Sequence, residues 1–388
     1  MLNRRLLRIK VMQSLYALKQ SEIANYHNAI GYIEEVFLPD LNSMEKQDVK
    51  KLEHDKKKAT QHFERYFEKE SQAFEKEEPK IKDAIRQAID QYYKQVEKDK
   101  KYFGKLLSKD IDGIHDSYIL VFSLLVELAE FAGVDYEEQQ NKPNKKASTT
   151  SYGIKLKDNQ IIELIRKNKE YISNTNKGKF VWNAEVIRSV YKDLKADKTF
   201  QEYEDTKGKD FEADKNIVIH ILKNLIFKGS YLQSFFEERE LNWAENRSIV
   251  KSMVVKTIKS VESKTDGVKL LALSANWEED EIFYEELYQK TVEKDRELER
   301  IASEKIKNWD IERVAALDRI ILIMAISEMI HFPSIPVKVT INEYIELSKL
   351  YSTPKSKQFV NGILDKLAED LIRKGLIRKS GRGLIDNK

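Results

Sequence analysis

Helix-breaking residues are scarce in this chain, and this scarcity most limits what it can fold into. Its 388 residues include only 13 glycines and 6 prolines. Sheets need frequent turns, which rely on glycine and proline, so few turn-formers and long runs of helical periodicity predict an all-α protein. Hydrophobic residues make up 41% of the chain, enough for a packed core, and charged residues make up 34%, which indicates long solvated helices.

Charge and cysteine content narrow the function classes. The chain has 68 basic and 65 acidic residues, so nucleic-acid binding would have to come from local clusters rather than from net charge. Cysteine is absent, which excludes disulfides and cysteine-ligated metals and fits a reducing compartment. The strongest apolar run, Ile320 to Ile326, is too short to span a bilayer. We therefore expect a cytoplasmic protein without a membrane partner.

The first predicted helix covers residues 3–20 and has an apolar face and a basic face. The helix dipole disfavours cations at an N-terminus, so a run of arginines there suggests an anionic partner. Snorkelling side chains on a solvated face are an equally good explanation from these residues alone. The apolar face consists of Leu7, Val11, Leu15 and Leu18. The basic face consists of Arg4, Arg5, Arg8 and Lys10.

Further helices fill the middle of the chain. A short helical stretch is predicted over 21–38, and a charged antiparallel hairpin over about 44–104, turning at Glu78-Pro79. A more apolar helix follows over 117–133, ended by Gly133. The polar segment at about 137–153 is the best candidate for a linker.

An internal repeat occupies the second half. Residues 214–243 and 280–309 have equal length, and their apolar positions and terminal Asn-Trp pairs match at an offset of 66. A weaker echo follows Trp182. Such repeats predict one helical unit that was copied, each copy burying its apolar stripe on a neighbour. The repeated tryptophans are therefore expected to be core or helix-end anchors rather than base-stacking platforms.

The last third is the most informative part. Residues 313–332 are apolar on nearly all sides and predict a central helix, broken by the two prolines that follow. The segment 340–343, "TINE", reads as a capping box that opens the next helix. In "STP", Ser352 or Thr353 is the expected N-cap and Pro354 the first residue of the last helix.

An Asn-Gly pair lies inside that last helix, although glycine costs about 1 kcal/mol against alanine in a helix interior. Gly362 is expected to permit the close approach of a neighbouring helix, and Asn361 to bond a nearby backbone group. RNA contact is the alternative for both residues. The tail after Arg373 is basic.

Three segments resemble the NusB transcription antitermination family. "IPVKVTINEYIELSKLYSTPKSKQFVNGILDKLAEDL" is similar to its C-terminal signature, "RRLLRIKVMQSLYALKQ" to its arginine-rich first helix, and "WDIERVAALDRIILIMAISEM" to its central helix. The resemblance covers residues 1–20 and about 280–375. It implies an all-α fold of two small helical bundles, in which residues 1–38 and 265–388 form the core. Residues 39–264 would then be a large inserted region that holds the hairpin, the linker and repeat units at about 180–264.

The resemblance also implies a function in binding. Proteins of this family bind NusE, a small-subunit ribosomal protein, and the pair grips the boxA element of nascent ribosomal RNA, helping RNA polymerase to keep elongating. The implied partners are thus boxA-type single-stranded RNA, NusE and the RNA polymerase elongation complex. No cofactor or metal is implied.

Site residues are carried over from the family's motifs. One position departs from the pattern, because many relatives have an acid where this chain has Lys355, and a cation there should favour RNA. Phe359 could stack on an unpaired base or belong to the core, and Tyr16 could equally be a core tyrosine. The implied RNA-binding residues are Arg4, Arg5, Arg8, Lys355, Ser356, Lys357, Gln358 and Phe359. The implied NusE-binding residues are Tyr16 and Asp318.

Two other functions compete with this interpretation. An enzyme, such as the RNA methyltransferases fused to NusB-like domains, would need a glycine-rich cofactor loop and a catalytic cysteine. The sequence has no strand-associated glycine motif of that form and no cysteine, so catalysis is not expected. A helical scaffold of the transcription machinery with little direct RNA binding is the alternative, since a long charged hairpin suits protein docking.

Overall fold

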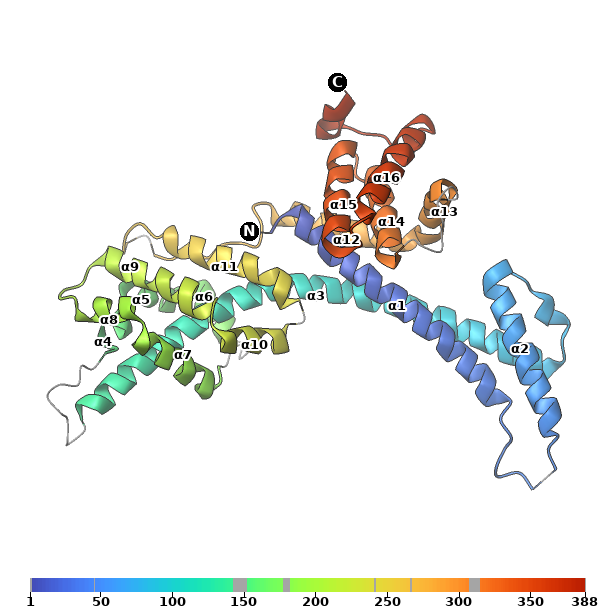
Figure 1. The fold of residues 1–388 in the computed structure, drawn as a ribbon, viewed down its shortest axis with the longest axis horizontal. Helices are drawn as coiled ribbons and strands as arrows, with labels where there is room; N and C mark the ends of the chain where they lie inside the picture. Colours follow the sequence, from blue (N-terminus) through green and yellow to red (C-terminus); the bar gives the residue numbers. More distant parts are fainter. Residues whose placement is uncertain are drawn as a thin grey trace. The chain divides into compact units, whose positions relative to one another are not determined.

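The structure is a computed structural model that describes residues 2–44, 46–141, 152–176, 182–240, 242–265, 267–306 and 315–387. All regular structure within these ranges is helical, which confirms the all-α prediction (Figure 1). The chain divides into two units. The first unit contains Met1–Arg4 and Lys109–Asp280, and the second unit contains Arg5–Ser108 and Glu281–Lys388.

Helix α1 runs without interruption over Arg4–Val36. The division into two helices near residue 20 was therefore wrong, and no proline lies in this segment to impose one. The predicted apolar stripe is confirmed, because all four of its members are buried. The stripe consists of Leu7, Val11, Leu15 and Leu18.

A helical hairpin follows α1. Helix α2, Val49–Lys69, begins where the Asp48 side chain accepts the amide of Lys51, and the short 3₁₀ helix η1 covers Ala73–Lys76. Pro79 then opens α3, where a missing N–H costs nothing. The hairpin and the end of α1 share one apolar cluster that includes Ile33, Phe63 and Ile85.

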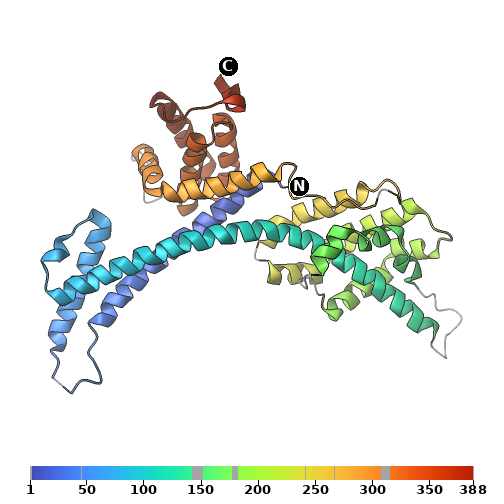
Figure 2. The same cartoon turned by 180° about the vertical axis from the view of Figure 1, so that it is seen from behind.

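Helix α3 is a single helix of 62 residues, Pro79–Gln140, as Figure 2 shows in cyan and green. It passes through Gly133, so the separate helix expected over 117–133 is its second half. An 18-residue window of α3 is apolar and long enough to cross a bilayer, but 78% of that window is buried within the protein, as in a core helix. Most of the predicted linker, residues 142–151, lies outside the described residues.

The carboxylate of Asp99 fixes the register between α1 and the first half of α3. It accepts hydrogen bonds from Ser21 at 2.6 Å, Asn25 at 2.7 Å and Gln95 at 2.8 Å. Burial by itself would raise the pKa of Asp99, but these hydrogen bonds outweigh it and the pKa is lowered. The first half of α3 is thus joined to α1 by a defined set of hydrogen bonds.

The first unit packs short helices on the second half of α3. The buried Asn159 donates from its side-chain amide to the hydroxyl of Tyr203 and to the carbonyl of Asp214. The helices are α4 (Ile154–Lys157), α5 (Gln160–Arg166), α6 (Lys169–Thr175), α7 (Ala184–Ala196), α8 (Lys198–Asp205), α9 (Phe211–His220), the π-helical turn η2 (Ile221–Ile226), α10 (Ser230–Arg239) and α11 (Trp243–Lys259).

The second unit ends in a bundle around one apolar helix. Helix α14 is buried along nearly its whole length, which confirms the prediction of a central helix, and it packs against the helices on either side of it in sequence. Figure 1 shows this group in orange and red. The helices are α12 (Trp277–Glu293), α13 (Asp295–Ile306), α14 (Ala316–His331), α15 (Val337–Tyr351), α16 (Ser356–Arg373) and the 3₁₀ helix η4 (Gly381–Asn387).

The internal repeat is visible in the helices. Shifted by 66 residues, α9 with η2 falls on α12, and α10 falls on α13. The buried positions also match, since Ile217, Val218, Ile221 and Leu222 correspond to Phe283, Tyr284, Leu287 and Tyr288. Trp243 is buried at the start of α11, as expected of an anchor, whereas Trp309 lies outside the described residues.

Candidate nucleic-acid interface

The arginine-rich start of α1 is held by a buried ion pair. The guanidinium of Arg8 donates from Nε and Nη2 to the two carboxylate oxygens of Glu328 on α14, both at 2.7 Å. The side chains are only 3% and 0% exposed. Burial is the largest single influence and opposes the charged form of Arg8. The charge and hydrogen bonds of Glu328, with the nearby Tyr344 and Glu343, together outweigh burial, so the pKa of Arg8 is raised.

Helix α15 completes the shell around Glu328. Thr340 donates its hydroxyl to one carboxylate oxygen at 2.8 Å, and Tyr344 donates to the other at 3.1 Å. Burial, followed by the charge of Glu328, raises the pKa of Tyr344, so its hydroxyl stays a donor. The capping-box prediction was wrong, because α15 already begins at Val337 and Thr340 serves Glu328 instead.

The other two arginines also meet carboxylates. Arg5 forms a bidentate pair with Glu343, with both distances at 2.8 Å, and its side chain remains 42% exposed. The hydrogen bond from Arg5 is the main cause that lowers the pKa of Glu343. Arg4, which belongs to the first unit, pairs with Asp280 at 3.1 Å. Of Arg5 and Arg8, the two arginines of α1 in the second unit, Arg5 therefore has the more exposed side chain.

Sequence reasoning missed Glu328 and Glu343 as partners of the arginines. A signal for Glu328 was present, since it is an acid inside the otherwise apolar segment 320–330. A buried carboxylate needs a buried cation or hydrogen bonds, so a central helix that carries one predicts a basic partner elsewhere.

The turn between α15 and α16 separates buried from exposed members of the predicted site. Ser356 is buried and donates its hydroxyl to Asp318 at 2.6 Å. Its oxygen also accepts the backbone amide of Thr353 at 3.2 Å. Lys355, Lys357 and Gln358 are exposed around this anchor, and Phe359 is half-buried. Ser356 and Asp318 thus hold the turn that presents the two lysines.

The start of α16 differs from the prediction. The helix begins at Ser356, after Lys355, and not at Pro354. The expected cap by Ser352 or Thr353 is therefore replaced by the hydroxyl cluster around Ser356, in which both residues lie within hydrogen-bond distance of its oxygen. Within the part of the chain that the structure describes, no side chain caps the first amides of α16. Those amides lie next to Lys355 and Lys357.

The Asn361-Gly362 pair does not serve helix packing. A Cβ atom added at Gly362 would meet no atom within 4 Å, so the expected close approach of a neighbouring helix is wrong. The Asn361 amide lies 3.3 Å from the Asp365 carboxylate rather than on a backbone group. RNA contact remains the alternative for both residues, because Asn361 and Gly362 lie within two helical turns of the exposed Lys355 and Lys357.

The predicted partner residues differ in exposure. Tyr16 is 39% exposed and lines a groove of about 460 Å³, together with Ile23, Tyr26 and Ile320. Lys19 and Arg319 stand at the same groove. Asp318 is buried at the start of α14, where its carboxylate accepts the hydroxyl of Ser356.

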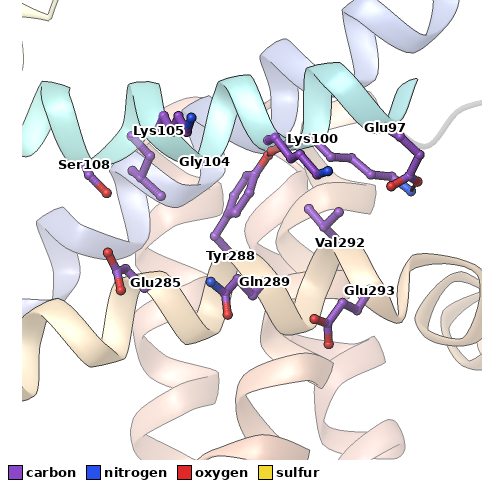
Figure 3. A pocket seen from close by; sticks show the side chains of 12 residues that line it. Glu97, Lys100, Gly104, Lys105, Ser108, Glu285, Tyr288, Gln289, Val292 and Glu293 are labelled. Atoms are coloured by element: carbon purple, nitrogen blue, oxygen red, sulfur yellow. Dashed lines mark hydrogen bonds and ion pairs between the residues drawn. The ribbon is translucent and has the colours of Figure 1, made fainter. Parts of the chain in front are cut away.

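A second groove lies between α3 and α12 in the second unit (Figure 3). Its volume is about 740 Å³. Gly104 of α3 faces the ring of Tyr288, where an added Cβ would come within 3.1 Å of a ring carbon. The Tyr288 hydroxyl donates to the carbonyl of Lys100 at 2.8 Å, which ties α12 to α3. Lys101 and Lys105 line one wall, and Glu285 and Glu293 line the other.

Comparison with known proteins adds family relationships. A model of the NusB family matches residues 249–369, which leaves α1 outside the match. The Transcription antitermination protein NusB of Salinibacter ruber is 40% identical over 147 residues, covering 36% of this chain and 91% of that protein. The protein of the same name from Bacillus pumilus is 36% identical over 109 residues, covering 28% and 83%.

A third relative matches a shorter stretch at higher sequence identity. The Transcription antitermination protein NusB of Chloroherpeton thalassium is 49% identical over 79 residues, covering 20% of this chain and 37% of that protein. No solved structure matches the chain significantly.

Proposed function

Because the chain belongs to the NusB family, we propose that it acts in transcription antitermination by binding boxA-type single-stranded RNA together with NusE. The observation that carries this proposal is the exposed pair Lys355 and Lys357, held at the uncapped start of α16 by Ser356 and Asp318. Free amides at a helix start attract phosphate, and the lysines add charge.

The RNA surface comprises the α15–α16 turn and the exposed guanidinium of Arg5. Gln358 supplies a polar group for base edges, and Phe359 a ring beside them. Arg8 contributes by fixing α1 on α14 through Glu328, and Arg4 supports the start of α1 through Asp280. The uncrowded surface at Gly362 lets RNA approach this helix closely. We assign binding and not catalysis to the chain, because its family matches are to antitermination proteins.

Replacing Lys355 by Asp is expected to lower the affinity for boxA-type RNA by about tenfold or more, because a cation becomes an anion beside phosphate. Fluorescence anisotropy with labelled RNA measures the change. Lys366→Asp is the matched control, since Lys366 is exposed on α16, about three helical turns beyond Lys355. Equal affinities of wild type, K355D and K366D would remove the turn from the RNA surface.

The groove at Tyr16 is the proposed contact for NusE. It combines apolar side chains with the cationic Lys19 and Arg319 at its edge, which suits a partner that presents an apolar segment. The complex of this chain with NusE and RNA would then contact RNA polymerase. This complex would form in the cytoplasm.

A charge in that groove should separate partner binding from RNA binding. Ile23 is 53% exposed there, and Ile23→Glu is expected to weaken NusE binding at least tenfold by placing an unpaired charge in an apolar contact. Isothermal titration with purified NusE measures it. Affinity for RNA without NusE should be unchanged, and Leu38→Glu, an exposed apolar position outside the groove, should bind NusE normally. Normal NusE binding by I23E would place the partner elsewhere.

A further inference from the structure

The first half of α3 carries a row of lysines that the proposed RNA surface does not use. Lys94, Lys98, Lys101 and Lys105 are all exposed. Their spacings of three and four residues place them on one face of the helix, with neighbouring Cβ atoms roughly 5–6 Å apart. We call these residues the α3 ridge. It lies in the second unit, outside the 249–369 family match.

The ridge is poorly neutralised by the protein itself. Lys94 pairs with Asp90 at 2.7 Å, but among the residues that the structure describes, Lys98, Lys101 and Lys105 have no ion pair. Like charges at these spacings destabilise a helix. Asp90 and Glu97 lie beside the ridge, but they pair with Lys94 and Lys100. The ridge therefore keeps an excess of positive charge, which suits an anionic partner that supplies the missing counter-charge.

Aromatic side chains flank the ridge. Tyr102 follows Lys101 and is 60% exposed. Tyr93 lines a surface hollow of about 340 Å³ with Lys94, Lys98 and Lys101, and with Glu97, which pairs with Lys100. The Tyr93 hydroxyl accepts a hydrogen bond from Arg296 of α13 at 3.3 Å. Cations in a row with accessible aromatic rings beside them are the combination that binds single-stranded nucleic acid, because phosphates meet the cations and bases stack on the rings.

The neighbouring groove limits where an anionic strand can lie. Figure 3 shows Lys105 of α3 on one side of it and Glu285 and Glu293 of α12 on the other. The acidic wall repels phosphate, so a strand is confined to the outer face of α3. The ridge offers no large aliphatic side chain between its lysines, which argues against insertion into a lipid surface.

We infer that the α3 ridge binds the backbone of single-stranded RNA flanking the boxA element, with Tyr102 stacking on an unpaired base. This inference rests on the proposed function, because the same transcript would contact the α15–α16 turn and the ridge. It gives the additional helical region a role in lengthening the bound RNA.

The test uses the full chain and two labelled RNAs, a minimal boxA-type RNA and the same element with long unpaired flanks. The variant K98Q/K101Q/K105Q should bind the flanked RNA tenfold or more weakly, with a salt slope of log K against log[salt] smaller by about 2, because each lost phosphate contact on a single strand removes about 0.7. Its affinity for the minimal RNA should equal that of wild type. Tyr102→Ala should weaken only the flanked RNA, by about tenfold.

The matched control is K46Q/K50Q/K57Q, which removes the same charge from exposed lysines of the hairpin. If this control and the ridge variant bind the flanked RNA with equal affinity, the inference is overturned. An acidic protein then becomes the better partner for the ridge. If wild type binds neither the minimal nor the flanked RNA, and K355D has the same affinities as wild type, the proposed function itself fails. The two failures are thus distinguishable.

Discussion

Glu328→Ala is expected to lower the free energy of unfolding of the second unit by about 3–5 kcal/mol, because it leaves the buried guanidinium of Arg8 without its partner. The nearest remaining carboxylate is Glu343, whose oxygen lies 3.8 Å from Arg8 and already serves Arg5. Thr340 and Tyr344 also lose their acceptor. Urea unfolding followed by circular dichroism gives the change, and hydrogen exchange of α1 and α14 assigns it to this unit.

A double variant separates an unpaired charge from lost packing. Arg8→Met with Glu328→Leu removes both charges and should recover most of the stability, because apolar residues of similar volume often replace buried ion pairs without cost. If E328A is as stable as wild type, the pair does not hold α1 on the bundle, and the placement of Arg5 next to Glu343 loses its support.

Trp243→Ala should produce a loss of similar size in the first unit, about 3–5 kcal/mol in its free energy of unfolding. The side chain is 2% exposed and stacks on Phe236, with 4.0 Å between the ring centroids. Trp243→Phe keeps a stacked ring and should cost much less. Hydrogen exchange in α11 locates the loss.

The same variant shows where RNA binding resides. Because Lys355, Lys357 and the α3 ridge belong to the second unit, W243A should bind boxA-type RNA with wild-type affinity under conditions where it is folded. A large loss of RNA affinity in folded W243A would mean that the first unit takes part in RNA binding.

Periodicity was sufficient to predict the helices that bury an unmistakable face. The all-round apolar character of 313–332 predicted the burial of α14, and the 66-residue offset predicted two helical pairs with the same buried positions. The ends of the helices were harder to predict from the sequence. The join within α1 and the length of α3 were missed, because a polar or glycine-containing segment can continue a helix when neighbouring helices cover its apolar residues.

Long-range polar contacts could not be predicted from local patterns. "TINE" satisfies the pattern of a capping box, yet its Thr340 contacts Glu328 on the preceding helix, and its Glu343 contacts Arg5, which lies 338 residues away in sequence. Likewise, nothing local distinguishes buried Ser356 from exposed Lys355 and Lys357. Their difference arises from Asp318 on α14, which the fold brings to the turn.

The most direct measurement of the central claim is fluorescence anisotropy of a labelled boxA-type RNA across a salt series, with and without purified NusE, for wild type and for R5A/K355A/K357A. This variant leaves the buried Arg8–Glu328 pair intact and should fold normally. We predict binding by wild type that weakens steeply with salt, strengthens with NusE, and is largely lost in the variant. Equal, salt-insensitive signals for both proteins, or no binding by wild type in any condition, would contradict the account and favour a protein scaffold.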